Sequence, residues 1–193
     1  METFRLNIKN MVCPRCIMAV EETLRDLGIA FTEVKLGEVN LTKELGTEEL
    51  LVLETKLKQL GFELLNDKNL QLVERIKNEI IQLVHYQDNP DKMGHLSKQL
   101  PSLIGQSYTS LSKLFSESEG ITIERYLILQ KIERAKELLS YGELNVSEIA
   151  LQLNYSSSQH FSRQFSGIVG FSPTVYAKNE KKDRSPIHRI HKD

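Results

Sequence analysis

The sequence predicts an α+β domain at the N-terminus followed by an all-α domain that contains one small unit built twice. Three observations lead to this division. Apolar and polar residues alternate over residues 4–8, and strand-like and helix-like segments then follow each other as far as residue 66. Only helical periodicity is found beyond residue 69. Within that second part, a motif of apolar, Ser, basic, any, Phe and Ser residues returns fifty positions later.

The N-terminal domain, residues 1–66, is expected to have the element order βαββαβ, which is the ferredoxin-like arrangement. Gly28 and Gly61 are expected to end its two helices, and Gly37-Glu38 to form a turn between two strands. The expected elements are a strand at 4–8, a helix at about 17–27, strands at 29–36 and 39–41, a helix at 47–60 and a strand at 62–64.

The second domain is expected to span residues 69–178, with the boundary near 66–69. Its expected helices are 69–86, 93–103, 107–116, 122–140, 146–153, 157–166 and a last one opening at Pro173. Ser107 and Ser156 are expected as N-caps, Asn145 and Glu148 as a capping pair, and Asn154 as a left-handed turn residue. Residues 179–193 form a polar, basic tail that we expect to be poorly ordered.

Composition limits the functional classes. The net charge is −1, which by itself does not indicate nucleic-acid binding. The apolar runs are too short to cross a bilayer and no secretory leader is recognisable, so we expect a soluble cytoplasmic protein with no membrane partner. No nucleophile–base pair and no phosphate-cradling glycine loop is apparent, so we expect no enzymatic activity. None of the histidines lies at ligand spacing from the cysteines, and His85 is expected to be exposed.

The repeated unit is typical of a helix-turn-helix. The first copy runs from Leu111 to Ser116 and is followed by Gly120 and Tyr126, and the second runs from Phe161 to Ser166 and is followed by Gly170 and Tyr176. A helix-turn-helix needs a short first helix, a tight turn and a second helix with an outward-facing N-terminal part. Leu111 with Phe115, and Phe161 with Phe165, supply the apolar anchors of the two second helices.

The polar residues between these anchors are the candidate DNA-binding residues. Gln pairs with adenine, Arg with guanine or phosphate, and Ser with several base edges. In the second copy the candidates are Ser157, Ser158, Gln159, His160, Ser162 and Arg163, and in the first copy Tyr108, Thr109, Ser112 and Lys113. Pro101 falls where the second copy has Ala150, and it leaves open whether the first copy reads bases.

With these motifs in place, residues 71–178 resemble the AraC-type DNA-binding domain. The resemblance is carried by the segments Ile132–Leu139, Ser147–Ala150, Asn154–Ser157, Phe161–Phe165 and Gly170–Tyr176. It implies seven helices, with two recognition helices in successive major grooves of double-stranded DNA. The chain departs from the family at Pro101 and Asn154, where the family usually has Ala and Gly.

The two cysteines, Cys13 and Cys16, form a CxxC motif on a loop before the first helix. Two soft thiolates select Cu(I) or Zn(II), and a pair of ligands suits Cu(I) better than tetrahedral Zn(II). The motif and the βαββαβ order resemble the heavy-metal-associated domain of copper chaperones, with Asn10 in place of that family's Gly. A redox pair of the Cys-Pro-x-Cys type and a pair without function remain alternatives.

Together these observations predict a sequence-specific transcription regulator that responds to a soft metal ion, with Cu(I) favoured over Zn(II). The alternative is a metal carrier or dithiol redox module tethered to a DNA-binding domain. No recognisable motif identifies the operator, the oligomeric state, or whether the protein activates or represses transcription.

Overall fold

The computed structural model describes residues 4–87, 96–178, 184 and 187. The chain divides into two compact units, residues 1–78 and 79–193, and each is described by itself. The division falls inside helix α3 (Lys68–Ile81), C-terminal to the boundary expected at 66–69. The first turns of α3 belong to the N-terminal unit because polar side chains on this helix bond to backbone groups of that unit.

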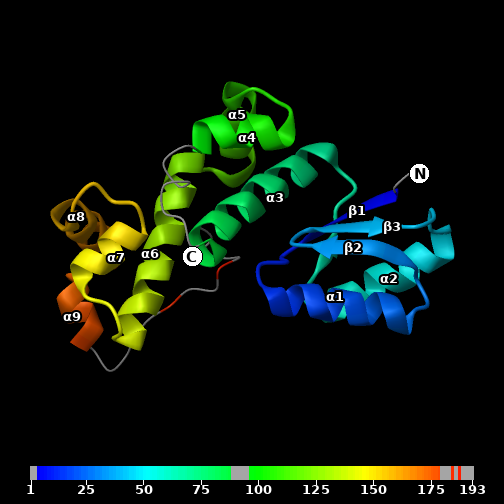
Figure 1. The fold of residues 1–193 in the computed structure, drawn as a ribbon. Helices are drawn as coiled ribbons and strands as arrows, with labels where there is room; N and C mark the ends of the chain where they lie inside the picture. Colours follow the sequence, from blue (N-terminus) through cyan, green and yellow to red (C-terminus); the bar gives the residue numbers. More distant parts are fainter. Residues whose placement is uncertain (1–3, 88–95, 179–183, 185–186, 188–193) are drawn as a thin grey trace. The chain divides into compact units, whose positions relative to one another are not determined.

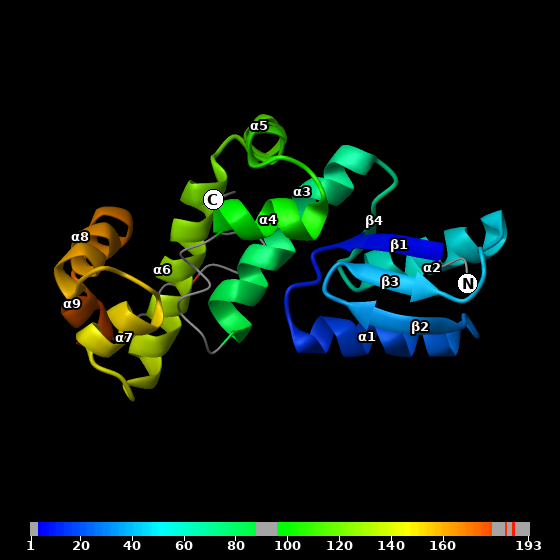
Figure 2. The same cartoon turned by 45° about the horizontal axis from the view of Figure 1, so that its top comes forward.

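The N-terminal unit has the predicted order βαββαβ. Its elements are β1 (Phe4–Lys9), α1 (Pro14–Asp26), β2 (Phe31–Lys35), β3 (Glu38–Leu41), α2 (Thr47–Gln59) and β4 (Glu63–Leu64). The strands form one antiparallel sheet in the order β2-β3-β1-β4. Helices α1 and α2 lie on the same face of this sheet (Figures 1 and 2). The small α/β unit with a four-stranded antiparallel sheet therefore agrees with the expected element order.

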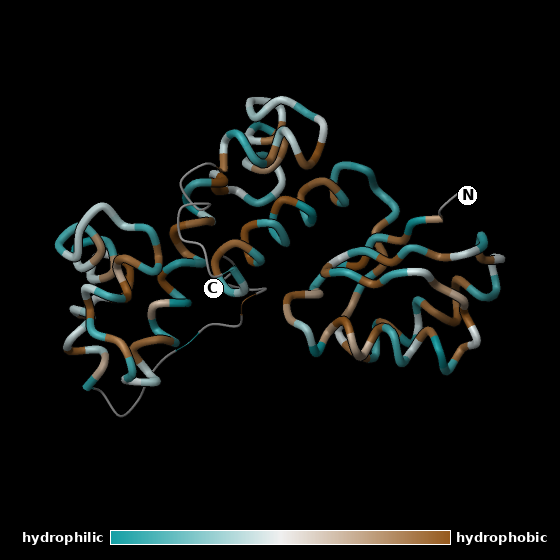
Figure 3. The backbone as a smooth tube through the Cα atoms, viewed as in Figure 1, coloured by the Kyte–Doolittle hydropathy of each residue, from teal (hydrophilic) through white to brown (hydrophobic). Residues whose placement is uncertain are grey.

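The core of this unit lies between the sheet and the two helices. Brown apolar positions alternate with teal polar ones along these elements (Figure 3). The strand residues Ile8 and Val39 and the helix residues Leu24 and Leu53 are fully buried. The alternation predicted for β1 is thus real, because one face of the strand is covered and the other is not.

Helix α3 is fixed to the N-terminal unit by three side chains on one face. Gln71 Nε2 donates to Leu65 O at 2.6 Å, and Asn78 Nδ2 donates to Leu36 O at 3.3 Å. Glu74 Oε1 accepts the Asn10 N–H at 3.1 Å. Gly37, with φ +78, makes room for the side chain of Asn78, since a Cβ at Gly37 would lie 2.1 Å from Asn78 Nδ2.

The C-terminal unit is helical over its described residues. The predicted helix 69–86 is correct in extent, but its end changes to the π-helix η1 (Gln82–Tyr86). The elements that follow are α4 (Leu96–Ile104), α5 (Tyr108–Glu119), α6 (Ile123–Tyr141), α7 (Val146–Gln152), α8 (Ser158–Val169) and α9 (Pro173–Lys178). The long helix α6 connects the α4–α5 pair to the α7–α9 group (Figure 1).

Two sequence expectations need correction here. Ser157, not Ser156, caps α8, with its side chain accepting from His160 N. His85 is not a free surface residue, because its ring bonds to Gln130. Pro101 lies inside α4, and the described helix continues through it.

The predicted tail, residues 179–193, lies outside the described residues except for two positions. Arg184 pairs with Glu137 at 3.6 Å, and Ile187 O accepts from Gln130 Nε2 at 3.1 Å. The start of the helix expected at 93, together with His95, His188 and His191, lies outside the described residues too. Among the residues that the structure describes, no helix combines the length and the apolarity needed to span a bilayer.

Candidate nucleic-acid interface and cysteine loop

The sequence repeat is also a structural repeat. The rings of Phe115 and Tyr126 lie 5.6 Å apart in an edge arrangement, and those of Phe165 and Tyr176 do the same at 5.6 Å. The second helix of each unit ends at a left-handed glycine, Gly120 with φ 73 in α5 and Gly170 with φ 85 in α8. Each recognition-helix candidate therefore sits on an equivalent aromatic anchor.

Helix α8 presents most of the predicted residues to solvent. Gln159, His160 and Arg163 are exposed, whereas Phe161 and Phe165 are fully buried beneath them. Ser157 is exposed as the N-cap, and Ser158 and Ser162 are half-buried. The helix N-terminus adds unpaired backbone N–H groups that favour anions such as phosphate. The second copy thus exposes hydrogen-bonding side chains beside a helix N-terminus.

Helix α5 has the same alternation of exposed and buried positions. Thr109 and Lys113 are exposed, and Ser112 is half-buried. Tyr108 differs from the expectation of a free contact, since its hydroxyl donates to Glu124 Oε1 at 2.5 Å. Burial and this carboxylate raise the pKa of Tyr108 above its ordinary value. Lys113 forms only a long 3.9 Å pair with Glu117, so its charge remains available.

The two turns are not identical. In the first unit, one residue separates the left-handed Gly105 from the N-cap Ser107. In the second unit, Tyr155 and Ser156 separate the left-handed Asn154 from the N-cap Ser157. The offset between the copies therefore changes from 49 before the turn to 50 after it. The expected cap Ser156 lies 49 residues after Ser107, whereas the observed cap Ser157 lies 50 residues after it.

Sequence reasoning missed two residues next to this turn. Tyr155 lies against His160 and Phe161, with ring centroids 5.5 and 5.2 Å away. Lys131 of α6 is 8% exposed, and its Nζ lies 5.2 Å from the centroid of the Tyr155 ring. Burial lowers the pKa of Lys131 to about 8. No sequence pattern marks a lysine for burial, since lysine side chains are almost always exposed.

The cysteine loop precedes α1. Cys13 is its N-cap, Pro14 occupies the first helical position, and the Cys16 N–H donates to Cys13 O at 2.9 Å. The two Sγ atoms are 3.2 Å apart, and both side chains are half-buried. Burial is the main reason why the pKa of the Cys16 thiol is raised.

Asn10 explains how this loop does without the glycine of the resembled family. Its φ is 72, a left-handed conformation that Asn tolerates better than other side chains do. Its Nδ2 donates to Gly61 O at 3.0 Å, and its backbone N–H donates to Glu74. The side chain of Met11 is fully buried in the core. The loop is thus tied to the α2–β4 turn and to α3.

The donor atoms of this loop suit a soft cation better than a hard one. Among the described residues, no group of three or more His, Cys, Asp or Glu side chains could hold a metal ion, so this loop offers the two cysteine sulfurs. A near-linear ion between two sulfurs needs them about twice a metal–sulfur bond of ~2.3 Å apart. The observed 3.2 Å therefore requires rotation of the cysteine side chains, which their partial exposure permits.

The helical part of the chain is similar to known proteins. Residues 102–179 match the model of a family described as "Helix-turn-helix domain". An uncharacterized HTH-type transcriptional regulator of Staphylococcus aureus is 37% identical over 78 residues, which is 40% of this chain and 10% of that protein. The xylose operon regulatory protein of Escherichia coli (strain K12) is 32% identical over 97 residues, which is 50% of this chain and 25% of that protein.

A solved structure is similar to part of the chain. The C-terminal domain of AraT, a response regulator from Geobacillus stearothermophilus, is 25% identical, with a TM-score of 0.45, covering 59% of this chain and 93% of that chain. The present chain spans only about a tenth to a quarter of the length of the two regulators named above. The names of these proteins describe regulators. Residues 102–179 are thus similar to a helix-turn-helix family, and the chain is similar in part to proteins named as transcriptional regulators.

Proposed function

We propose that the chain is a transcription regulator that places α5 and α8 in two successive major grooves of double-stranded DNA. The observation that carries this proposal is the repeated pattern of exposed and buried positions on the two helices. Each helix buries an apolar pair and exposes the polar residues of its first turns. Grooves one helical turn apart, about 34 Å, are what a duplicated reader of this kind requires. Action on chromosomal DNA would place the protein in the cytoplasm.

The two helices are expected to contribute unequally. Helix α8 exposes Gln159, His160 and Arg163, all of which can donate to base edges or phosphates. In α5, Tyr108 is engaged by Glu124, and Lys113 is the basic group that remains for phosphate. We therefore infer that α8 supplies most of the sequence discrimination and that α5 supplies register on the backbone.

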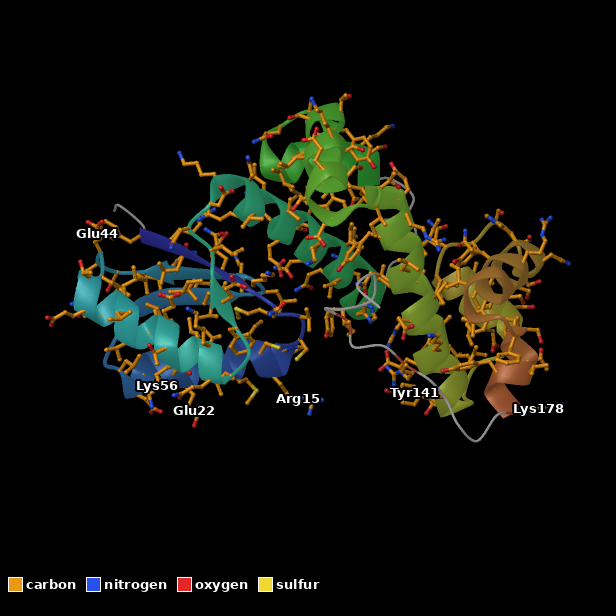
Figure 4. The ribbon with its side chains drawn as sticks, turned by 180° about the vertical axis from the view of Figure 1, so that it is seen from behind. Arg15, Glu22, Glu44, Lys56, Tyr141 and Lys178 are labelled. Carbon is orange, nitrogen blue, oxygen red and sulfur yellow. The ribbon has the colours of Figure 1, made fainter. Side chains whose placement is uncertain are left out.

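Selection of bound fragments from random DNA, followed by a band-shift titration, tests this proposal. We expect Arg163→Ala and Gln159→Ala to weaken binding to the selected sequence by about 1–3 kcal/mol. Lys56→Ala is the control, because Lys56 is an exposed basic residue of the N-terminal unit on α2 (Figure 4). No enrichment of any sequence by the wild-type protein, or losses that Lys56→Ala reproduces, would contradict the proposal.

We further propose that the N-terminal unit is a ferredoxin-like, heavy-metal-associated-like domain that binds Cu(I), or more weakly Zn(II), through Cys13 and Cys16. Two soft donors on one turn before a helix support this proposal. A route to the rest of the chain is also available. Ion binding that moves the loop would act on the Asn10–Glu74 bond and so on α3, an element that runs across the division between the units.

A dithiol redox module is the second candidate. The 3.2 Å separation of the sulfurs favours it, because closing a disulfide of about 2.05 Å needs only a small movement. Titration with Cu(I) and turnover of a small disulfide substrate separate the candidates, with Cys13→Ser/Cys16→Ser as the control. Tight binding without turnover supports the metal proposal, and turnover supports the redox module. A wild-type protein that matches the double variant in both assays would overturn both candidates.

A further inference from the structure

The second helix-turn-helix contains an aromatic residue that the first lacks. Tyr155 occupies the longer turn, where the first unit has only Gln106 between its left-handed residue and its cap. The Tyr155 hydroxyl donates to Gln164 Oε1 at 2.6 Å, and its backbone N–H donates to Ala150 O at 2.9 Å. The turn is thus bonded both to the helix before it and to the recognition helix after it.

The buried Lys131 also contacts the Tyr155 ring. The ammonium group of Lys131 lies 5.2 Å from the Tyr155 centroid, within the range of a cation–π contact. The part of the chain that the structure describes gives Lys131 no ion pair. A desolvated ammonium strengthens a cation–π contact relative to an exposed one, because water no longer competes for the charge. Tyr155 is therefore fixed between α6 and α8.

His160 rests against this fixed ring. Its imidazole meets Tyr155 edge-on, with an interplanar angle of 81°, and its Nδ1 lies 3.2 Å from Ser156 Oγ. Its backbone N–H donates to the N-cap Ser157. The side chain remains exposed in spite of these contacts. Two neighbours therefore restrict a ring that would otherwise turn freely on a helix surface, and Nε2 is the nitrogen they leave unused.

We propose that Tyr155 is a positioning residue for the second recognition helix, held by Lys131, and that it orients His160 for a hydrogen bond from Nε2 to a base edge. When the Ser156 hydroxyl donates to Nδ1, the ring hydrogen of the neutral imidazole lies on Nε2. Purine N7, guanine O6 and thymine O4 in the major groove accept such a bond. This inference rests on the proposed DNA binding, and it adds Tyr155, Ser156 and Lys131 to the determinants of specificity.

The first test needs no DNA. In NMR spectra of the full chain, the Tyr155 ring is expected to displace the imidazole proton signals of His160 by its ring current. Tyr155→Phe should keep this displacement and Tyr155→Leu should abolish it. Tyr141→Leu is the matched control, since Tyr141 is 60% exposed on α6 (Figure 4). Unchanged His160 signals in Tyr155→Leu would overturn the positioning role.

The second test is a double-mutant cycle on the sequence selected by the wild-type protein. His160→Ala should weaken specific binding about 5- to 150-fold and leave non-specific binding unchanged. Tyr155→Leu should weaken it in the same way, and the double variant no more than the stronger single variant. Lys131→Met should weaken specific binding with a melting transition that stays cooperative.

The outcomes separate the inference from the function on which it rests. Losses that multiply in the double variant, or equal losses on every DNA sequence, would overturn the orientation of His160 by Tyr155. Unaltered specific affinity in Lys131→Met would remove Lys131 from the arrangement. A wild-type protein that binds no DNA would overturn the proposed function, while the NMR comparison would still decide the contact between Tyr155 and His160.

Discussion

The carboxylate of Glu74 in α3 accepts the backbone N–H of Asn10, three residues before Cys13, at 3.1 Å. This bond joins the loop that carries both thiols to the helix that leaves the N-terminal unit. Glu74 is 6% exposed and also pairs with Lys77 at 3.2 Å. Any rearrangement of the cysteine loop therefore meets a buried, charged acceptor rather than solvent.

Replacing Glu74 tests whether this bond couples the loop to the rest of the chain. Glu74→Ala leaves the Asn10 N–H without its acceptor, and we expect it to destabilise the N-terminal unit by about 1–3 kcal/mol in chemical denaturation. The same variant should bind Cu(I) and DNA but lose the effect of Cu(I) on DNA affinity. Glu44→Ala, at an exposed glutamate, is the control (Figure 4). An unchanged Cu(I) response in Glu74→Ala would show that the coupling takes another route.

Asn154 offers a test of the turn geometry. Its φ of 53 is left-handed, a conformation that costs most side chains about 1–2 kcal/mol. Asn154→Ala should therefore lower the free energy of unfolding by about 1 kcal/mol, whereas Asn154→Gly should keep or raise it. Thermal melting of the three proteins measures the difference. Equal melting of the Ala and Gly variants would rule out backbone strain at this turn.

Lys131 makes the stability of the chain depend on alkaline pH. Burial lowers its pKa to about 8, against 10.5 in an unfolded chain. Between these values the unfolded state binds the extra proton, so stability should rise as the pH is raised from about 8 to 10.5. The whole difference is at most about 3 kcal/mol. Denaturant midpoints measured over this range should rise in the wild type, and Lys131→Met should remove this contribution.

His85 is expected to act at acidic pH. Burial lowers its pKa below the ordinary value of 6.5, and its Nε2 lies 3.0 Å from Gln130 Oε1. The unfolded chain therefore takes up a proton that the folded chain resists, and stability should fall as the pH drops below about 6.5. His85→Gln keeps a hydrogen-bonding side chain without titration. Its denaturation midpoint should decline less steeply with acid, and a parallel decline would assign the effect to other groups.

Salt dependence separates the two recognition helices. Lys113→Ala should weaken binding to all DNA sequences alike and reduce the slope of log affinity against log salt by about 1, as the loss of one phosphate contact requires. Arg163→Ala should instead reduce the preference for the selected sequence over random DNA. Lys56→Ala, an exposed lysine of α2, serves as the control in the band-shift titrations (Figure 4). A sequence-dependent loss in Lys113→Ala would assign base reading to α5.

Much of the fold was predictable because local rules agree with the tertiary structure. The period-2 pattern of β1, the Asn145–Glu148 capping box and the caps at Ser107 and Gly120 depend only on nearby residues. The repeat also predicted the buried anchors of α5 and α8, whereas four residues expected to face solvent are half-buried: Tyr108, Ser112, Ser158 and Ser162. The long-range contacts were not predictable, such as the bonds that hold the first turns of α3 to backbone groups far away in sequence.

The site was less predictable than the fold for a related reason. The contact between Lys131 and Tyr155 could not be predicted from the sequence, because it joins α6 to a turn more than twenty residues later. Tyr108 looked like a free polar residue until Glu124 appeared beside it. The cap of α8 was expected at Ser156, but the side chain of the neighbouring Ser157 makes the capping bond.

The extra residue in the second turn has a practical consequence for anyone who engineers this protein. Grafting base-reading residues from one copy of the repeat onto the other works only if equivalent residues are matched with the right offset. This offset is 49 residues before the turn and 50 residues after it. A design that ignores the inserted residue would exchange inward-facing for outward-facing positions. The copies have thus diverged in geometry as well as in composition, and they are not interchangeable parts.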